Sequence, residues 1–336
     1  MKGRINRMLY PLVFPFKLSY GTFYEREGLI IELSQDGVKG FGEMSFVPYY
    51  GKEEDVIMDQ LNRILLHLEE VGKDWTPWEL FQHLMDEYTP DLFLMSAVDC
   101  ALYDLYGKLK KLPVWQLVGG SREVKALSSL TITEGDWEEK LNWNWPVLKL
   151  KMGFEGDMDL LGAIRKRYSG DLRIDANSGW TVKGLDDRID RLVEWGIELV
   201  EQPVDRKDDD LLRGKDFPIP VAADESVQDP ADLDQIAEIY QVANLKLQKC
   251  GGITPAREMI RKCRELGLGL MAGCMTESSV GIGAMAHLGS FFDYLDLDGE
   301  HLIQPVLGDR RFVREGVVEL TGVGGIMDIG FVVSDL

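Results

Sequence analysis

The sequence predicts an α/β fold: a (β/α)7β barrel joined to an α+β capping domain. Three observations lead to this prediction. The chain of 336 residues is too long for one small core. Its second part repeats a β-rich segment followed by an amphipathic helix pattern, and its first part does not. We expect a capping domain over residues 1–115, a barrel over residues 116–311, and a C-terminal return to the capping domain over residues 312–336.

The repeated part contains eight candidate strands. They lie at residues 128–133, 147–153, 172–177, 197–203, 220–226, 243–249, 267–274 and 292–299. Apolar residues at i, i+3 and i+4 spacing predict helices between them, as in residues 157–168, 230–240 and 255–267. Strand–helix–strand units at this pitch predict parallel pairing with right-handed crossovers. Eight even repeats favour closure into a TIM-like barrel over the alternative, a doubly wound open sheet.

The ends of the chain follow another pattern. Residues 8–21 and 28–45 have the composition of strands, and residues 93–109 form a helix pattern. Strands followed by a helix indicate an α+β arrangement for the first part. Residues 316–329 indicate a strand and a turn after the barrel is complete.

Composition excludes several classes of protein. A net charge of −20 disfavours binding to nucleic acid and to anionic membrane surfaces. Pro11 and Pro15 interrupt the apolar N-terminal patch and no small-residue cleavage site follows, so we interpret it as a strand and not a signal. No apolar run has the length of a membrane span. The four cysteines show no CxxC spacing and fit free thiols in a reducing cytoplasm.

Ionisable residues recur at the predicted strand ends. In chain order they are Lys149, Lys151, Asp175, Glu201, Asp224, Lys246, Asp296 and Asp298. Each motif alone has an ordinary explanation as a cap, a turn former or a solvated face. From Lys151 to Lys246, however, the residues follow one another at one βα pitch, and in a parallel barrel such ends converge on one mouth. Three carboxylates on adjacent strands can provide the hard oxygen ligands that Mg²⁺ prefers, with an ammonium group on either side.

The ordered motifs KxK, DxN, ExP, DES and KxxKxGG resemble those of the enolase superfamily, in its muconate-lactonising subgroup. The resemblance extends to GFGEMSFVPYYG (40–51) and AVDCALYDLYGK (97–108). Within the subgroup, DLDG (296–299) together with GCMTESS (273–279) is similar to dipeptide epimerases. The likeness covers nearly the whole chain.

The resemblance implies a reaction and a set of roles. An epimerase of this kind inverts the α-carbon of the second residue of a dipeptide, here of the L-Ala-D/L-Glu type, by proton transfer between two lysines. Lys151 and Lys246 would be the bases, and Lys149 would lower the pKa of Lys151 and hold the substrate carboxylate. The other implied residues are Asp175, Glu201 and Asp224 for one Mg²⁺ per subunit, Asp296 and Asp298 for the substrate ammonium, and Thr131, Cys274 and Thr276 along the substrate. Strand alternation predicts that Glu225 points away from the mouth. A homo-oligomer is also expected.

Two questions stay open. An o-succinylbenzoate synthase or a muconate cycloisomerase would use the same lysines and metal. The substrate of such an enzyme, however, has no ammonium group that the DLD motif could bind. A relative that only binds a ligand would not need the acid/base set. In the L-Ala-D/L-Glu branch an arginine of the first lid loop can pair with the glutamate side chain, but Gly21 stands there in this sequence. Lys17 or Arg26 would favour an acidic second residue if either reaches the pocket. Tyr20, Phe23 and Tyr24 would otherwise favour a hydrophobic one.

Overall fold

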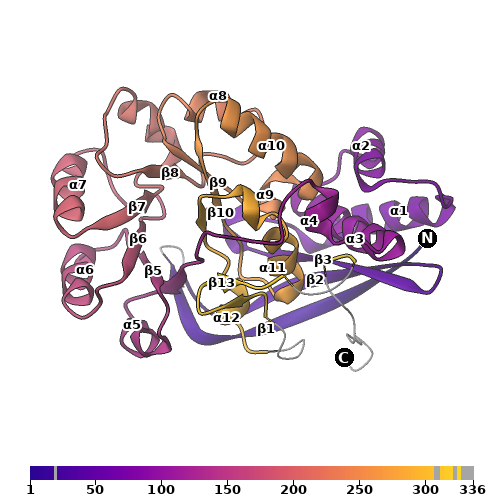
Figure 1. Cartoon of the computed structure of the whole chain (residues 1–336), viewed down its shortest axis with the longest axis horizontal. Coiled ribbons are helices and arrows are strands. Elements are labelled where there is room, and N and C mark those ends of the chain that lie inside the picture. Colours follow the sequence, from indigo (N-terminus) through magenta and orange to yellow (C-terminus); the bar gives the residue numbers. More distant parts are fainter. Residues whose placement is uncertain (19–20, 306–310, 321–323, 327–336) are drawn as a thin grey trace.

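The structure is a computed structural model that describes residues 1–18, 21–305, 311–320 and 324–326 (Figure 1). Two of the sequence predictions concern residues that lie partly outside these ranges. Lys17, Tyr20 and Gly21 lie outside the part whose side chains are described, and so do residues 321–323 and 327–336 of the predicted C-terminal return.

Eight parallel strands form the central sheet, in the order β11-β10-β9-β8-β7-β6-β5-β4. Their bounds are β4 Leu130–Ile132, β5 Val147–Lys151, β6 Asp171–Asp175, β7 Ile197–Glu201, β8 Val221–Ala223, β9 Val242–Leu245, β10 Gly269–Ala272 and β11 Tyr294–Leu295. A parallel bridge between Ser128 and Leu295 joins the two edge strands, and Ser129 N donates to Leu295 O at 2.9 Å. The predicted barrel is therefore confirmed over the open-sheet alternative.

Helices cover the outside of this sheet (Figure 1). They are α5 Trp137–Lys140, η2 Leu141–Trp143, α6 Asp157–Arg165, α7 Leu185–Glu194, η3 Arg206–Leu212, α8 Leu233–Ile236, α9 Leu247–Cys250, α10 Ile253–Glu265, α11 Ser279–Ala286, η4 Gly289–Phe291 and α12 Gly299–Leu302. The crossover from β7 to β8 has only a 3-10 helix, η3. Its segment begins with an acidic run and ends at Gly214, Pro218 and Pro220, so it lacks the apolar stripe of a long helix.

The capping part is an antiparallel sheet with helices on it. Its strands are β1 Lys2–Leu18, β2 Gly21–Gln35 and β3 Val38–Phe46, and η1 Pro48–Tyr50, α1 Glu54–Glu70, α2 Pro77–Tyr88, α3 Leu92–Lys110 and α4 Val114–Leu117 follow. Gly40 and Gly42 let α3 lie directly on β3. A Cβ at Gly42 would stand 1.9 Å from Ala97 O, and one at Gly40 would stand 2.4 Å from Leu105 N.

Buried hydrogen bonds fix the capping part to the barrel mouth. Glu43 on β3 accepts from Ser278 N and Gly281 N, each at 2.9 Å, at the beginning of α11. Ser45 N donates to Gln248 Oε1 at 2.9 Å. After the barrel, β12 (Val313–Arg314) and β13 (Val317–Val318) form a short hairpin, and Ile326 N then donates to Asp104 Oδ1 of α3 at 2.7 Å. These contacts hold β2 and β3 over the ends of the barrel strands.

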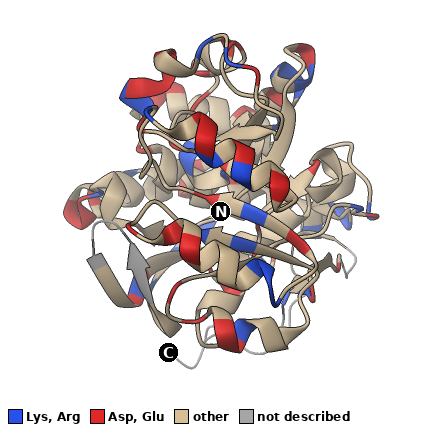
Figure 2. Cartoon of the chain, turned by 90° about the vertical axis from the view of Figure 1, so that its left-hand side faces the viewer, with Lys and Arg blue, Asp and Glu red and all other residues tan. Residues whose placement is uncertain are grey.

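Acidic and basic residues are both distributed over helices, strands and loops in Figure 2. Among the described residues, none of the helices combines the length and the hydrophobicity that crossing a membrane requires. All four cysteines are free thiols.

Candidate active site

A pocket of about 130 Å³, here called the reaction pocket, lies at the carboxyl ends of the barrel strands. Nine of the predicted site residues line it: Thr131, Lys149, Lys151, Asp224, Lys246, Cys274, Thr276, Asp296 and Asp298. Asp175 and Glu201, the other two, are buried and lie against Lys149. The strand ends therefore bring all eleven predicted residues to one place, since parallel strands share one mouth.

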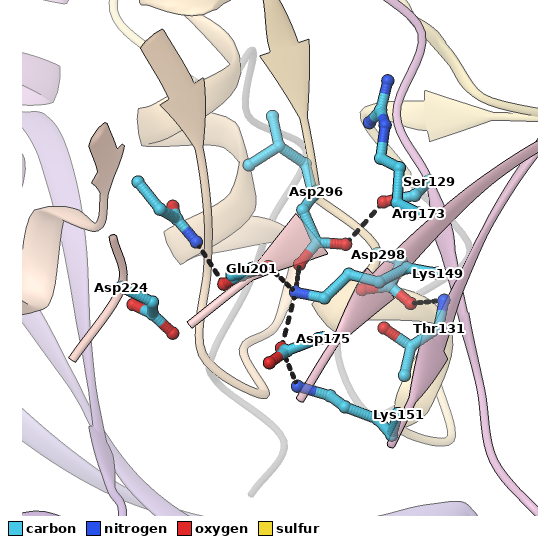
Figure 3. A network of polar contacts seen from close by, with 12 residues as sticks. Ser129, Thr131, Lys149, Lys151, Arg173, Asp175, Glu201, Asp224, Asp296 and Asp298 are labelled. Atoms are coloured by element: carbon cyan, nitrogen blue, oxygen red, sulfur yellow. Dashed lines mark hydrogen bonds and ion pairs between the residues drawn. The ribbon is translucent and has the colours of Figure 1, made fainter. Parts of the chain in front are cut away.

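Lys149 and Lys151, both on β5, lie side by side in the barrel (Figure 3). Both contact the same carboxylate, which offsets the repulsion between their charges. Asp175 Oδ2 lies 2.6 Å from Lys151 Nζ and 3.0 Å from Lys149 Nζ. Lys149 is also 2.7 Å from Glu201 Oε2 and 2.6 Å from Asp296 Oδ2. Burial acts to lower the pKa of Lys149, but these three carboxylates outweigh it and raise the pKa well above the ordinary value. Burial likewise opposes the two lysines at Asp175, whose pKa they lower to about 2.

The two aspartates after β11 differ in how they are paired. Asp296 accepts from Lys149 Nζ and, at 2.7 Å, from Ser129 Oγ. Asp298 accepts from Thr131 N at 2.6 Å (Figure 3). Burial and the charge of Asp296 raise the pKa of Asp298 to about 6. Asp298 thus carries the less compensated carboxylate of the pair, which suits it to a positively charged group of a ligand.

The β9 side of the mouth holds a second pair of lysines. Lys246 Nζ lies 2.7 Å from Asp224 Oδ2, and Lys249 Nζ lies 2.7 Å from Asp224 Oδ1. Lys249 also donates to the carbonyls of Asp224 at 2.6 Å and of Asn244 at 3.3 Å. Burial opposes the charge of Lys246, but Asp224 and its neighbours raise the pKa of this lysine well above the ordinary value. Asp224 is therefore held from both oxygens.

Glu201 lies between the two sides. Asn244 Nδ2 donates to Glu201 Oε1 at 2.7 Å, and Lys149 faces Oε2. Burial raises the pKa of Glu201 to about 8, and the charge of Asp175 adds to this rise. A glutamate of this kind is ionised at neutral pH only if more positive charge lies nearby.

In chemical type, the donor set suits a hard divalent cation. Asp175, Glu201 and Asp224 bring carboxylate oxygens from three consecutive strand ends, and the charges of Lys149 and Lys246 do not offset the rise in the pKa of Glu201. As the described side chains stand, no three Asp, Glu, His or Cys residues come close enough together to hold a metal, and lysine ammonium groups lie against all three carboxylates.

Residues of the capping part close the pocket. Arg26 of β2 and Val47, Tyr49 and Tyr50 around η1 line it. Arg26 is only 5% exposed, and its guanidinium carbon lies 4.0 Å from the centroid of the Phe23 ring. Of the two lid cations that the sequence analysis left open, Arg26 therefore lines the pocket.

Glu225 is a correction to the sequence analysis, because it lines the reaction pocket and does not point away from it. Strand β8 ends at Ala223, so the alternation of side chains does not continue to residue 225. Its Oε2 atom is buried and has no hydrogen-bond partner among the described residues, and burial together with Asp224 raises the pKa of Glu225 to about 7.

Sequence reasoning assigned no role to Asn244, Lys249 or Ser129. Lys249 was visible as the second lysine of KxxKxGG, and Asn244 lies two residues before Lys246, on the same face of β9 by alternation. Neither sequence pattern predicts which carboxylate Lys249 or Asn244 contacts.

Comparison with known proteins gives full-length matches. Residues 4–119 match the N-terminal domain of mandelate racemase / muconate lactonizing enzyme, and residues 136–324 match the enolase C-terminal domain-like family. An L-Ala-D/L-amino acid epimerase of Flavobacterium johnsoniae is 32% identical over 97% of this chain and 98% of its own.

Two solved structures are also similar over almost their whole length. A substrate-liganded complex of the L-Ala-D/L-Glu epimerase from Bacillus subtilis has a TM-score of 0.89 and 29% identity, covering 99% of this chain and 100% of that one. A dipeptide epimerase from Methylococcus capsulatus, complexed with Mg and the dipeptide L-Arg-D-Lys, has a TM-score of 0.88 and 27% identity, covering 97% of this chain and 98% of that one. From its two matching domains and its full-length relatives, this chain belongs to the mandelate racemase / muconate lactonizing enzyme family of the enolase superfamily.

Proposed function

We propose that the protein is a dipeptide epimerase, an isomerase that inverts the α-carbon of the second residue of a dipeptide. One observation carries the proposal: Lys151 and Lys246 line the same pocket from β5 and β9, which β6, β7 and β8 separate in the barrel. Bases on opposite sides of one carbon can remove a proton from one face and return one to the other. The full-length epimerase relatives support the same reaction.

The other residues bind and orient the substrate. Asp175, Glu201 and Asp224 would hold one Mg²⁺, which when bound stabilises negative charge developing on the substrate carboxylate. Asp298, with Asp296 beside it, would attract the substrate ammonium, and Thr131, Cys274 and Thr276 would lie along the dipeptide. Lys149 keeps Asp175, Glu201 and Asp296 together. An o-succinylbenzoate synthase or a muconate cycloisomerase would leave Asp298 without a cationic partner.

Arg26 supports an acidic second residue, as in L-Ala-D/L-Glu. Its cation is buried against Phe23 and lines the reaction pocket, where a substrate carboxylate could reach it. Tyr24, by contrast, is 70% exposed. Changing Arg26 to Met should lower kcat/KM for L-Ala-L-Glu roughly tenfold or more while sparing L-Ala-L-Leu and L-Ala-L-Phe. A tenfold preference of the wild type for the apolar dipeptides would contradict this choice of substrate.

The reaction itself is tested by proton exchange. The protein is incubated in D₂O with these dipeptides, and ¹H NMR follows the α-proton of the second residue together with the appearance of the other epimer. We expect the α-proton to exchange and the other epimer to appear. Both reactions should stop in EDTA and recover when Mg²⁺ is added. Full activity in rigorously metal-free protein, or dehydration of a cyclohexadiene substrate in place of exchange, would refute the proposal.

The cellular setting is part of the same proposal. A cytoplasmic location, a role in cell-wall peptide metabolism and a homo-oligomeric state accompany the epimerase assignment, and the free thiols are consistent with a reducing compartment. Fractionation and size-exclusion chromatography would test the location and the subunit number.

A further inference from the structure

A second cavity adjoins the reaction pocket and is much larger. This cavity, here called the outer hollow, has a volume of about 760 Å³, against about 130 Å³ for the reaction pocket. Lys151 and Asn177 line both, so the outer hollow begins directly behind the first predicted base. The reaction pocket is small for a whole dipeptide, whereas the outer hollow has the size of an ordinary ligand site.

The register of β4 and β5 relates the outer hollow to the ammonium site. Thr131 is paired with Lys149 and donates to Asp298. Thr133 lies two residues further along the chain and lines the outer hollow. A ligand whose ammonium lies at Asp298 therefore has the outer hollow beside it, one step outward along β4.

Apolar side chains form part of the wall of the outer hollow. Phe14 and Pro15 of β1 and Met152 and Phe154, after β5, line it, together with the polar residues Thr22, Thr133, Glu134, Lys151, Glu155 and Asn177. Gly135 also lines it, and among the described residues a Cβ there would meet only Thr133 Oγ1, at 3.9 Å. The ring and thioether surfaces can bind hydrocarbon through the removal of apolar area from water.

We infer that the outer hollow binds the side chain of the first residue of the dipeptide, and that the enzyme accepts first residues with large aliphatic or aromatic side chains. This inference rests on the proposed function, because it places the ammonium at Asp298 and the α-carbon of the second residue next to Lys151. In this inference the outer hollow selects a large side chain at the first residue of the dipeptide, and Arg26 selects an acidic side chain at the second.

The test fills the hollow. Gly135→Trp places a ring in the open space, and Gly72→Trp is the matched control, since Gly72 is exposed between α1 and α2 with nothing within 4 Å of its Cβ position. Rates are measured for L-Ala-L-Glu, L-Leu-L-Glu, L-Phe-L-Glu, L-Lys-L-Glu and L-Ala-L-Phe, and thermal unfolding verifies that both variants fold. Phe154→Ala, which removes one wall, is the second variant.

The quantity compared between the variants is the ratio of kcat/KM for L-Phe-L-Glu to kcat/KM for L-Ala-L-Glu. We expect the wild type to accept both L-Phe-L-Glu and L-Leu-L-Glu, and Gly135→Trp to lower the ratio at least tenfold, as crowding an apolar pocket typically does. Gly72→Trp should leave it unchanged, and Phe154→Ala should lower it several-fold.

Other outcomes would overturn the inference. Selective loss of L-Ala-L-Phe would show that the second side chain occupies the hollow, and selective loss of L-Lys-L-Glu would assign it to a cationic side chain. Equal losses for all dipeptides, or a wild type that rejects large first residues, would also refute it. If the wild type epimerises no dipeptide at all, the proposed function itself fails.

Discussion

The β5 and β9 sides of the reaction pocket are built alike but not identically. On each side an inner lysine is almost fully buried and an outer lysine is partly exposed. The outer lysines, Lys151 and Lys246, have side chains that are 18% and 12% exposed, and each contacts a single carboxylate. The inner lysines differ: Lys149 contacts three carboxylates, whereas Lys249 contacts one carboxylate and two backbone carbonyls.

This difference indicates a separate role for each inner lysine. Lys149 compensates negative charge from three strand ends at once and thereby links Asp296 of the DLD motif to Asp175 and Glu201, two of the three proposed metal ligands. Lys249 fixes the orientation of Asp224 alone, because its other contacts are to the main chain. The outer lysines resemble each other in one respect, since each contacts one buried carboxylate, Asp175 for Lys151 and Asp224 for Lys246.

The largest expected effect concerns the outer lysines. Lys151→Ala and Lys246→Ala should each lower the rate of epimerisation by roughly 10²- to 10⁴-fold, since each removes one acid/base group. Each variant should still exchange the α-proton of one epimer with D₂O, the epimer whose proton faces the remaining lysine. ¹H NMR of each epimer separately measures this. Near-native epimerisation by either variant would end the two-base assignment.

The inner lysines should separate in stability. Lys149→Met removes the ion-pair partner of two buried carboxylates, Glu201 and Asp296, and such a loss typically costs about 3–5 kcal/mol of unfolding free energy. Lys249→Met leaves Asp224 paired with Lys246, so its cost should be smaller. We expect the larger loss for Lys149→Met and its greater recovery with Mg²⁺, because two of its partners, Asp175 and Glu201, are proposed metal ligands. Urea unfolding with and without Mg²⁺ measures both.

Lys262→Met is the control for the inner lysines. Its partner Asp234 is exposed, and such surface pairs contribute about 0–1 kcal/mol. Equal losses for all three variants would contradict the distinction between buried and surface lysines.

A smaller effect is expected at the DLD motif. Asp298→Asn should raise KM for L-Ala-L-Glu roughly tenfold or more, because a desolvated charge pair loses one partner. N-acetylated dipeptides, which lack the ammonium, should be poor substrates of the wild type. Unchanged kinetics after acetylation would show that DLD binds no ammonium and would favour the synthase alternative.

The smallest effect is the pH dependence of substrate binding. Asp298 has a pKa raised to about 6 by burial and by Asp296, so it is ionised above this pH and becomes neutral below it. KM for dipeptides should therefore be low above pH 6 and rise as the pH falls through 6. The profile of Asp298→Asn should lack this rise. A wild-type KM that is flat from pH 5 to pH 8 would exclude Asp298 from binding.

The architecture could be predicted from the sequence because it depends on local patterns. All eight predicted barrel strands are present, as each apolar run is followed by turn-forming polar residues. The convergence of Lys151, Asp175, Glu201, Asp224 and Lys246 also follows from pattern, since parallel strands of equal pitch end at the same rim. The helix predicted at residues 230–240 is shorter, with α8 limited to Leu233–Ile236.

The partners of those residues could not be predicted in this way. Glu225 faces the pocket because β8 is only three residues long, and alternation gives no direction beyond a strand end. Arg26 reaches the pocket because β2 pairs along β3, and Glu43 of β3 is hydrogen-bonded to the beginning of α11, a segment far away in the sequence.

The sequence by itself determined the barrel, the set of ionisable side chains at its mouth and the family to which they are similar, because these depend on periodicity and on the order of residues along one chain. The tertiary structure alone decided which lysine neutralises which carboxylate, that Arg26 lines the pocket, and that a large hollow lies behind Lys151. These depend on distances between segments far apart in the chain, which packing of the capping sheet on the barrel sets.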